Sequence, residues 1–236
     1  MVTTLFLIRH GETEGSETKR YKGSMDVALS DKGIEQARKA AVFVYDYLKK
    51  NVADRDKGYL RDIQKETGRP IRPSGAAKLE AVYCSDLSRA VKSAEKIAGP
   101  YECEPVSVPE LRERNFGIWE NMNFVEIRDR YPVEFNAWAD NPLQFSPPGG
   151  ESTLDLRDRV LPAFDRILDS HSGQCIAIVA HGGINRVLLC HMLGIPLENI
   201  FRIEQDYAAV NIIEFWDRYP VVKCMNHVSY EGCNNG

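Results

Sequence analysis

The sequence predicts an α/β fold, a three-layer αβα sandwich whose central sheet is mixed but mostly parallel. Short apolar runs alternate with helical segments over most of the 236 residues, which is the pattern of strand–helix–strand units. Residues 2–8 and 175–180 are almost wholly apolar, as is typical of central strands covered on both faces. The last two apolar runs are joined by a short turn at 217–220, so the sheet is expected to contain an antiparallel pair.

Capping and turn residues set the expected boundaries of the elements. Ser30 and Ser152 each precede a segment with helical spacing of apolar residues, and serine is a good N-cap residue. Gly99–Pro100 and Gly194 are expected to end helices, because glycine and proline interrupt the helical pattern. Strands are expected over 2–8, 79–85, 102–108, 175–180, 208–215 and 221–225, and helices over 30–50, 87–97, 152–170 and 184–193.

We interpret residues 1–236 as a single domain, since a chain of this length can bury a full core. Residues 51–78 are rich in glycine, proline and charge and poor in apolar residues, which predicts a surface insertion. Residues 231–236 are expected to be a frayed tail. Residues 109–150 are irregular, helical and aromatic. Among them Phe116, Trp119 and Trp138 are expected either to line a substrate pocket or to pack in a core or lid.

Composition excludes several classes of protein. The chain is 43% apolar and 27% charged with a net charge of −4, which is ordinary for a globular protein and gives no reason to expect nucleic acid or an anionic membrane as a partner. The first apolar run lacks a basic flank and is too short for a signal peptide or a membrane span, so a cytoplasmic protein is expected. The six cysteines form no C-x-x-C pair and read as reduced, buried residues rather than a metal site.

Charged and polar residues follow three of the predicted strands. Arg9–His10–Gly11 ends the first, Ser85–Asp86 ends the second with Arg89 one turn further on, and His181–Gly182–Gly183 ends the run at 175–180. The carboxyl ends of parallel strands meet at one edge of an open sheet, where ligands collect. Two arginines and two histidines would therefore converge there, which predicts an anion site.

Phosphoryl transfer is the chemistry that this set of residues suits. Arginine binds phosphate bidentately and stays charged, and glycines after a histidine let the backbone approach an anion closely. Neighbouring cations keep an imidazole neutral, and a neutral imidazole can attack phosphorus. An acid is still needed to protonate the leaving oxygen. The residues alone leave open which histidine attacks and which carboxyl serves among Glu12, Asp26, Glu113, Glu120 and Glu151.

The motifs resemble those of the histidine phosphatase superfamily, in its phosphoglycerate-mutase-like branch. The similar segments occur in the family's order and cover nearly the whole chain apart from 51–78 and the tail. They are residues 7–13 with the signature Leu-Ile-Arg-His-Gly-Glu-Thr, residues 85–90 with the second arginine, residues 111–120 with the acid, and residues 148–152 and 179–183.

The resemblance implies a role for each member of the predicted site. His10 is implied as the nucleophile that becomes phosphohistidine, and Glu113 as the general acid that later activates water. Arg9, Arg89 and His181 are implied to hold the phosphoryl oxygens. The resemblance implies no metal and no cofactor.

Four further residues are expected to contact the phosphate. Gly182 is expected to donate a backbone N–H, and Gly23 lies at the family's spacing after the signature. Ser16 stands where the family often has asparagine, and serine, although shorter, can still donate a hydrogen bond. Arg20 is close to the position where some members carry another phosphate-binding arginine.

The resemblance implies a phosphomonoesterase that acts on a small phosphorylated metabolite, for which α-ribazole 5'-phosphate and sugar phosphates are candidates. A cofactor-dependent phosphoglycerate mutase is the alternative. Residues 117–150 are shorter and less basic than the stretch that mutases carry after the acid motif, which favours hydrolysis. A non-catalytic binding or regulatory module is a remote alternative, because the catalytic set is complete. The sequence does not fix the oligomeric state and allows a homodimer.

Overall fold

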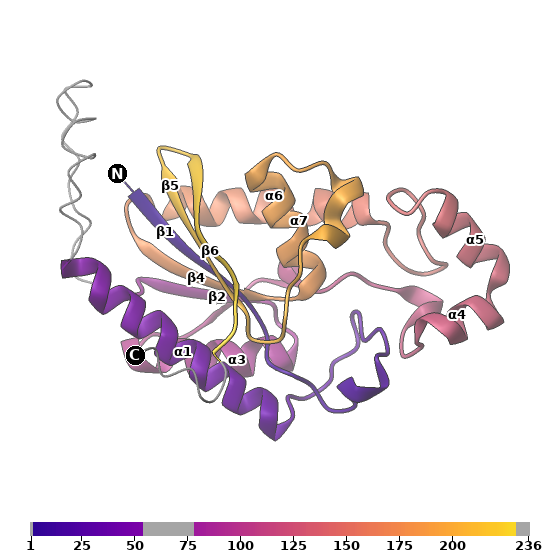
Figure 1. Ribbon diagram of the computed structural model, residues 1–236, viewed down its shortest axis with the longest axis horizontal. Coiled ribbons are helices and arrows are strands. Elements are labelled where there is room, and N and C mark those ends of the chain that lie inside the picture. Colours follow the sequence, from indigo (N-terminus) through magenta and orange to yellow (C-terminus); the bar gives the residue numbers. More distant parts are fainter. Residues whose placement is uncertain (1, 54–77, 230–236) are drawn as a thin grey trace.

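The computed structural model describes residues 2–53 and 78–229, and it contains a six-stranded mixed sheet (Figure 1). The strand order is β3-β2-β4-β1-β5-β6. β3, β2, β4 and β1 run parallel, whereas β5 pairs antiparallel with both β1 and β6. The strands are β1 (Val2–Arg9), β2 (Ala81–Cys84), β3 (Val106–Ser107), β4 (Cys175–Ala180), β5 (Val210–Trp216) and β6 (Tyr219–His227).

Two layers of helices cover the sheet, which confirms the predicted three-layer α/β fold. α1 and α3 pack together on one face, and α6 and α7 pack together on the other (Figure 1). The α-helices are α1 (Asp31–Ala53), α3 (Ser88–Ala98), α4 (Phe124–Arg130), α5 (Pro132–Asp140), α6 (Thr153–Ser170) and α7 (Gly182–Leu193). Short 3-10 helices are η1 (Ser16–Thr18), η2 (Gly99–Tyr101), η3 (Pro109–Leu111), η4 (Gly117–Trp119) and η5 (Leu197–Arg202).

Alternate residues of the central strands build two separate cores. Leu5 and Leu7 of β1 join the cluster beneath α6 and α7, while Phe6 and Ile8 join the cluster beneath α1 and α3. These four side chains are at most 1% exposed. Successive side chains of a strand point to opposite faces, so a strand covered on both faces must be apolar throughout. This is why the nearly unbroken apolar runs of β1 and β4 predicted their central places.

Some expected boundaries differ from the structure, and others fall on residues that it does not describe. The strand expected over 102–108 is only the two-residue β3, which lies at the edge of the sheet and pairs with β2 alone. The helix expected from 184 begins at Gly182, so His181 is its N-cap. Most of the expected insertion at 51–78 lies outside the described residues, because residues 54–77 are not described. The expected tail at 231–236 also lies outside them. The single domain stays a prediction.

No helix in the described ranges is long and apolar enough to cross a membrane.

The predicted N-cap of α6 is a complete capping box. The Asp155 backbone N–H donates to Oγ of Ser152 at 3.0 Å, and the Ser152 N–H donates to the Asp155 carboxylate at 2.9 Å. We expect Ser152→Ala to lower the free energy of unfolding by about 1 kcal/mol, because it leaves an end N–H without a partner. Urea unfolding would measure this loss.

Ser170→Ala is the matched control for that measurement. Ser170 lies exposed on the last turn of the same helix, where its hydroxyl donates to the Arg166 carbonyl. Its loss should change the free energy of unfolding by less than about 0.5 kcal/mol. Equal effects of the two substitutions would show that the capping box does not stabilise α6.

Candidate active site

The carboxyl ends of β1, β2 and β4 meet at one edge of the sheet, as the sequence predicts. β4 lies between the other two strands, so His181 is placed beside His10, with the two ring centroids 5.0 Å apart. Arg9, His10, Arg89, Glu113 and Gly182 all line one pocket of about 270 Å³. A pocket of this size suits a small ligand.

The ring of His10 is held in one tautomer by a neighbouring carbonyl. Nδ1 of His10 lies 2.7 Å from the carbonyl oxygen of Gly11. A carbonyl only accepts, so Nδ1 carries the proton and donates, and the lone pair of the neutral ring resides on Nε2. The ring is 6% exposed. His10 therefore presents a nucleophilic nitrogen from a fixed position.

Glycines let the loop that carries His10 pack tightly on the start of α1. A Cβ on Gly11 would lie 2.2 Å from the carbonyl oxygen of Gly33, and a Cβ on Gly33 would lie 1.9 Å from that of Glu12. The Gly11 N–H also donates to Oγ of Ser93 on α3 at 3.1 Å. The loop is thus fixed from both helices of this layer.

His181 is completely buried, and neither of its ring nitrogens has a hydrogen-bond partner among the described residues. Buried polar groups are nearly always paired, and exceptions gather at functional sites. An oxygen-rich ligand in the pocket would supply the partners that the protein does not.

Arg9 is held by groups that leave part of its guanidinium for a ligand. Nη1 donates to the Gln205 carbonyl at 2.5 Å, and the guanidinium carbon lies 3.9 Å from the centroid of the Tyr207 ring. Nε is buried and has no partner within the described chain. Gln205 is itself fixed by side-chain hydrogen bonds with Asn211 and Asn185, both fully buried.

Arg89 is 2% exposed and fastens the loop between β1 and α1 to the pocket. Nη1 donates to the Met25 carbonyl at 2.6 Å, and Nη2 donates to the Gly23 carbonyl at 2.7 Å. Gly23 has a φ of 50°, and a Cβ there would lie 2.5 Å from Oε1 of Glu120. Gly23 lines the pocket and acts on Arg89 through its carbonyl.

Burial and the two arginines set the charge state of both histidines. Burial, followed by the charges of Arg9 and Arg89, holds the pKa of His10 well below 6.5, against the Gly11 carbonyl, which favours the proton. Burial also holds the pKa of His181 well below 6.5, assisted by His10, Arg89 and Arg9. Both rings are therefore neutral near pH 7.

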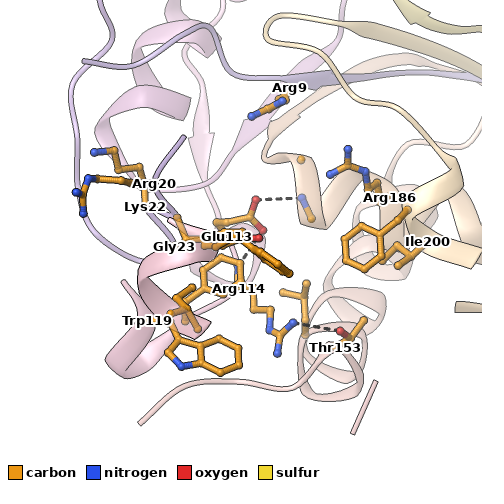
Figure 2. Close-up of a pocket in the computed structure, with 18 of the residues that line it drawn as sticks. Arg9, Arg20, Lys22, Gly23, Glu113, Arg114, Trp119, Thr153, Arg186 and Ile200 are labelled. Carbon is orange, nitrogen blue, oxygen red and sulfur yellow. Dashed lines mark hydrogen bonds between the residues drawn. The ribbon is translucent and has the colours of Figure 1, made fainter. Parts of the chain in front are cut away.

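Glu113 is the only acidic residue that lines this pocket within the described chain. The Arg114 N–H donates to its Oε1 at 2.9 Å, and the Gly183 N–H donates to its Oε2 at 3.0 Å (Figure 2). A Cβ on Gly183 would lie 2.4 Å from Oε1, so only glycine lets the carboxylate come this close to the start of α7.

The other four candidate acids form ion pairs or accept hydrogen bonds outside the pocket. Glu151 forms an ion pair with Arg159 on α6 at 2.7 Å, which matches the helix-buttressing role that its place beside Ser152 suggests. Glu12 pairs with Lys32 at 2.8 Å, Asp26 accepts from the Ser88 N–H at 2.8 Å, and Glu120 accepts from the Ser24 N–H at 2.7 Å.

Two of the expected phosphate contacts are engaged elsewhere. The Ser16 hydroxyl donates to the Thr13 carbonyl at 2.7 Å and accepts from the Thr13 N–H at 3.1 Å, and Ser16 is not part of the pocket wall. Its short side chain closes a local turn. Arg20 does line the pocket, but its guanidinium donates to Glu126 of α4 at 2.7 Å and to the Asn121 carbonyl.

Sequence reasoning missed several residues of the site, namely Arg114, Arg186, Gln205, Tyr207 and Asn211. Two of them left a signal. Arg186 follows His181–Gly182 by about one helical turn, and Asn211 is a polar residue inside an otherwise apolar strand. Figure 2 shows Arg186 and Ile200 facing Lys22 and Gly23 across the pocket, with Glu113 between them.

The described residues contain no group of three or more His, Cys, Asp or Glu side chains arranged to hold a metal ion.

The model of the histidine phosphatase superfamily (branch 1) matches residues 5–51 and 72–228. The chain therefore belongs to this superfamily.

The chain is 25% identical to phosphoserine phosphatase 1 of Hydrogenobacter thermophilus, over 97% of this chain and 94% of that protein. It is 31% identical to the bifunctional protein Rv2228c of Mycobacterium tuberculosis, over 97% of this chain but only 55% of that protein's length. The crystal structure of the α-ribazole phosphatase from Shigella flexneri superimposes with a TM-score of 0.76 at 24% identity, over 97% of this chain and 99% of the other. This last likeness shows the fold.

The lowered pKa of the two buried histidines, His10 and His181, predicts a pH-dependent stability. In the unfolded chain each histidine binds a proton below about pH 6.5, whereas the folded chain resists it. Above about pH 6.5 the two histidines are neutral in both states and do not lower the free energy of unfolding. Below about pH 6.5 the unfolded chain binds more protons than the folded chain, so the free energy of unfolding falls as the pH falls. We expect a His10→Asn, His181→Asn variant to show a shallower fall in the free energy of unfolding below pH 6.5, by up to about 1.4 kcal/mol per pH unit for each histidine. Urea unfolding at several pH values would measure the slopes.

His191→Asn serves as the control, because His191 is exposed on α7 and does not line the pocket. This variant should keep the slope of the unaltered protein. A double variant with an unchanged slope would contradict the burial of two neutral imidazoles.

Proposed function

We propose that the protein hydrolyses small phosphomonoesters through a phosphohistidine formed at His10. The observation that carries the proposal is the fixed tautomer of His10. Its Nδ1 proton is held by the Gly11 carbonyl, so the Nε2 lone pair is available in a pocket that also holds Arg9 and Arg89. The residue roles below are part of this proposal.

The cations bind the phosphoryl group and stabilise the charge of the transition state. Arg9 offers its unpaired Nε, and Arg89 lines the same pocket with its guanidinium held by two carbonyls, which leave its charge uncancelled. His181 offers a ring N–H, and Gly182 lies at the positive N-terminal end of α7. Phosphoryl transfer asks a protein chiefly for this positioning and charge stabilisation.

Two steps complete the reaction. Nε2 of His10 attacks phosphorus and the ester P–O bond breaks, while Glu113 gives its proton to the leaving alcohol oxygen. Glu113 then takes a proton from a water molecule, whose oxygen attacks phosphorus and breaks the P–N bond. Inorganic phosphate leaves, and both His10 and Glu113 return to their starting states.

The substrate is a small phosphate ester, as the names of the relatives support. Phosphoserine phosphatase is the name of one relative and α-ribazole phosphatase that of a structural neighbour. α-Ribazole 5'-phosphate and sugar phosphates stand beside phosphoserine as candidates within this proposal. Phosphoglycerate mutation, which would return the phosphoryl group to a substrate, is the alternative, and these phosphatase names favour hydrolysis.

The partners, the cellular location and the oligomeric state are also part of the proposal. The net charge of −4 favours a free metabolite over a nucleic acid or membrane-bound ester. The six cysteines form no C-x-x-C pair, and a location in the cytoplasm is part of the proposal. The residues to which the proposal assigns chemistry all belong to one chain, so the proposal allows a homodimer.

Removing the nucleophile tests the mechanism directly. We expect His10→Ala to abolish both turnover of an aryl phosphate and the acid-labile phosphoenzyme seen after rapid quenching, because both need Nε2. Retained turnover would refute the phosphohistidine route. His191→Ala, on an exposed face of α7, should keep both activities.

The unaltered protein provides the control against a mutase. It should release inorganic phosphate in the absence of any bisphosphate primer. Primer-dependent conversion of 3-phosphoglycerate to 2-phosphoglycerate, without release of phosphate, would identify a mutase instead.

A comparison of good and poor leaving groups tests whether Glu113 is the general acid. We expect Glu113→Gln to slow hydrolysis of alkyl phosphates by about 10²- to 10⁴-fold and of aryl phosphates much less, because only the poor leaving groups need a proton. Steady-state kcat with both ester types would measure this. Glu12→Gln, which alters an acid paired with Lys32 outside the pocket, should slow neither. Equal slowing of both ester types by Glu113→Gln would assign the proton to another group.

A further inference from the structure

The wall of the pocket away from the strand ends is aromatic. Arg9, His10 and Arg89 line the part of the pocket at the strand ends, whereas many of the other lining residues carry aromatic rings or branched apolar chains. Figure 2 shows two of these, Trp119 and Ile200, with Glu113 and Arg114. We call these residues the apolar wall: Tyr21, Phe116, Trp119, Phe124, Ile127, Phe135, Trp138, Leu156, Ile200 and Phe201.

Two helices of the apolar wall contribute nothing to either core. α4 and α5 stand apart from the sheet (Figure 1), α5 has no buried residue, and neither helix supplies a member of the two core clusters. Their rings pack on one another instead: Phe124 lies 5.0 Å from Phe135 and 6.1 Å from Trp138, between ring centroids. The shared face of these rings borders the pocket.

Large apolar side chains from two different elements line the pocket. Phe124 on α4 is 46% exposed, and Phe201 on η5 is 72% exposed, although both are large and apolar. Ile200 lies beside Phe201 and is buried. Large exposed apolar surfaces that line a concave site mark a place that a ligand covers.

The cations near the apolar wall are mostly occupied. Arg20 donates to Glu126 and to the Asn121 carbonyl, and Arg186 donates to Glu204 and to the Ile203 carbonyl. Arg114 donates to the Glu151 and Phe145 carbonyls and to Thr153. Lys22 is then the remaining cation of this part of the pocket among the described residues. A polyol or a second anionic group would thus find few free donors there, whereas an apolar group would find apolar contacts.

We propose that the enzyme selects phosphomonoesters whose alcohol portion is an aryl or extended alkyl group, seated between the Phe124–Phe135–Trp138 rings and Ile200–Phe201. The proposal rests on the phosphatase function proposed above. The phosphate lies on the cations at the strand ends, the bridging oxygen faces Glu113, and the carbon chain follows the apolar wall outward. In this proposal the apolar wall determines which esters are preferred, and the residues at the strand ends carry out the phosphoryl transfer.

A homologous series of n-alkyl phosphates tests the proposal, because its members share nearly the same leaving group and differ only in apolar surface. We expect kcat/KM to rise about two- to fourfold for each added methylene from ethyl to hexyl phosphate, as the chain leaves water for the apolar wall. Hexyl phosphate should also exceed phosphoserine and a hexose 6-phosphate. A flat series, or a preference for phosphoserine, would overturn the proposal and assign selection to Lys22 and Arg186.

Two substitutions with matched controls locate the effect. Phe201→Ser and Phe124→Ser should each flatten the dependence of kcat/KM on chain length, because each removes apolar surface that the alkyl chain would cover. Tyr219→Ser matches Phe201 in exposure, 72%, but lies on β6 away from the pocket, and Val125→Ser is the exposed neighbour of Phe124 that does not line it. Both controls should keep the full dependence on chain length.

The outcomes separate this proposal from the phosphatase function itself. Formation of phosphoenzyme with all esters but no dependence on chain length overturns the choice of substrate and leaves the hydrolytic function standing. Absence of phosphoenzyme and of phosphate release with every ester overturns both. An unchanged dependence in Phe124→Ser and Phe201→Ser overturns the assignment to this wall.

Discussion

Two arginine side chains packed into the interior without a carboxylate in ion-pair contact are the constraint around which the site is built. Within the described chain, Nη1 of Arg9 and both Nη atoms of Arg89 donate to the carbonyls of Gln205, Met25 and Gly23, while Nε of Arg9 has no partner. Carbonyls satisfy hydrogen bonds but do not cancel charge, so a net positive charge remains for an anionic ligand. The loops that carry these carbonyls must therefore be fixed, and each is held by buried polar side chains or close glycine contacts.

The same uncancelled charge also prepares the nucleophile. Burial is the main reason that the pKa of His10 and of His181 is lowered, and the nearby arginine charges lower both further, so both rings stay neutral. The Gly11 carbonyl decides which nitrogen of His10 carries the single proton. One electrostatic arrangement thus serves both binding and reactivity. An ion-pair partner for Arg9 or Arg89 would weaken both at once.

Local patterns were sufficient to predict the parts of the site that depend on strand ends. Apolar runs that stop at Arg9–His10 and at His181 identify central strands, and the sheet itself brings their ends together. Glu113 could not be separated from the other four acids by the residues alone, because its role depends on the approach of a loop to the start of α7. That approach is a tertiary contact, allowed by Gly183.

Other features depended on distant contacts or on fine geometry. Gln205 and Asn211 act on Arg9 through the packing of β5 against β1, which no local spacing encodes. Ser16 has a hydroxyl that could bind phosphate, but its short side chain donates its hydrogen bond to the Thr13 carbonyl instead. The strand near 106 is shorter than its apolar residues suggest, because an edge position pairs it on one side only.

The close packing of Gly11 on Gly33 has a consequence for how the chain tolerates genetic change. Gly33 belongs to the first turn of α1 and lines no part of the pocket, yet a methyl group there would occupy the space of the Glu12 carbonyl. Substitutions that alter the backbone of the His10 loop therefore require matching substitutions at the start of this helix. A survey of natural variants that scored only ligand-facing positions would overlook one of the residues on which the placement of His10 depends.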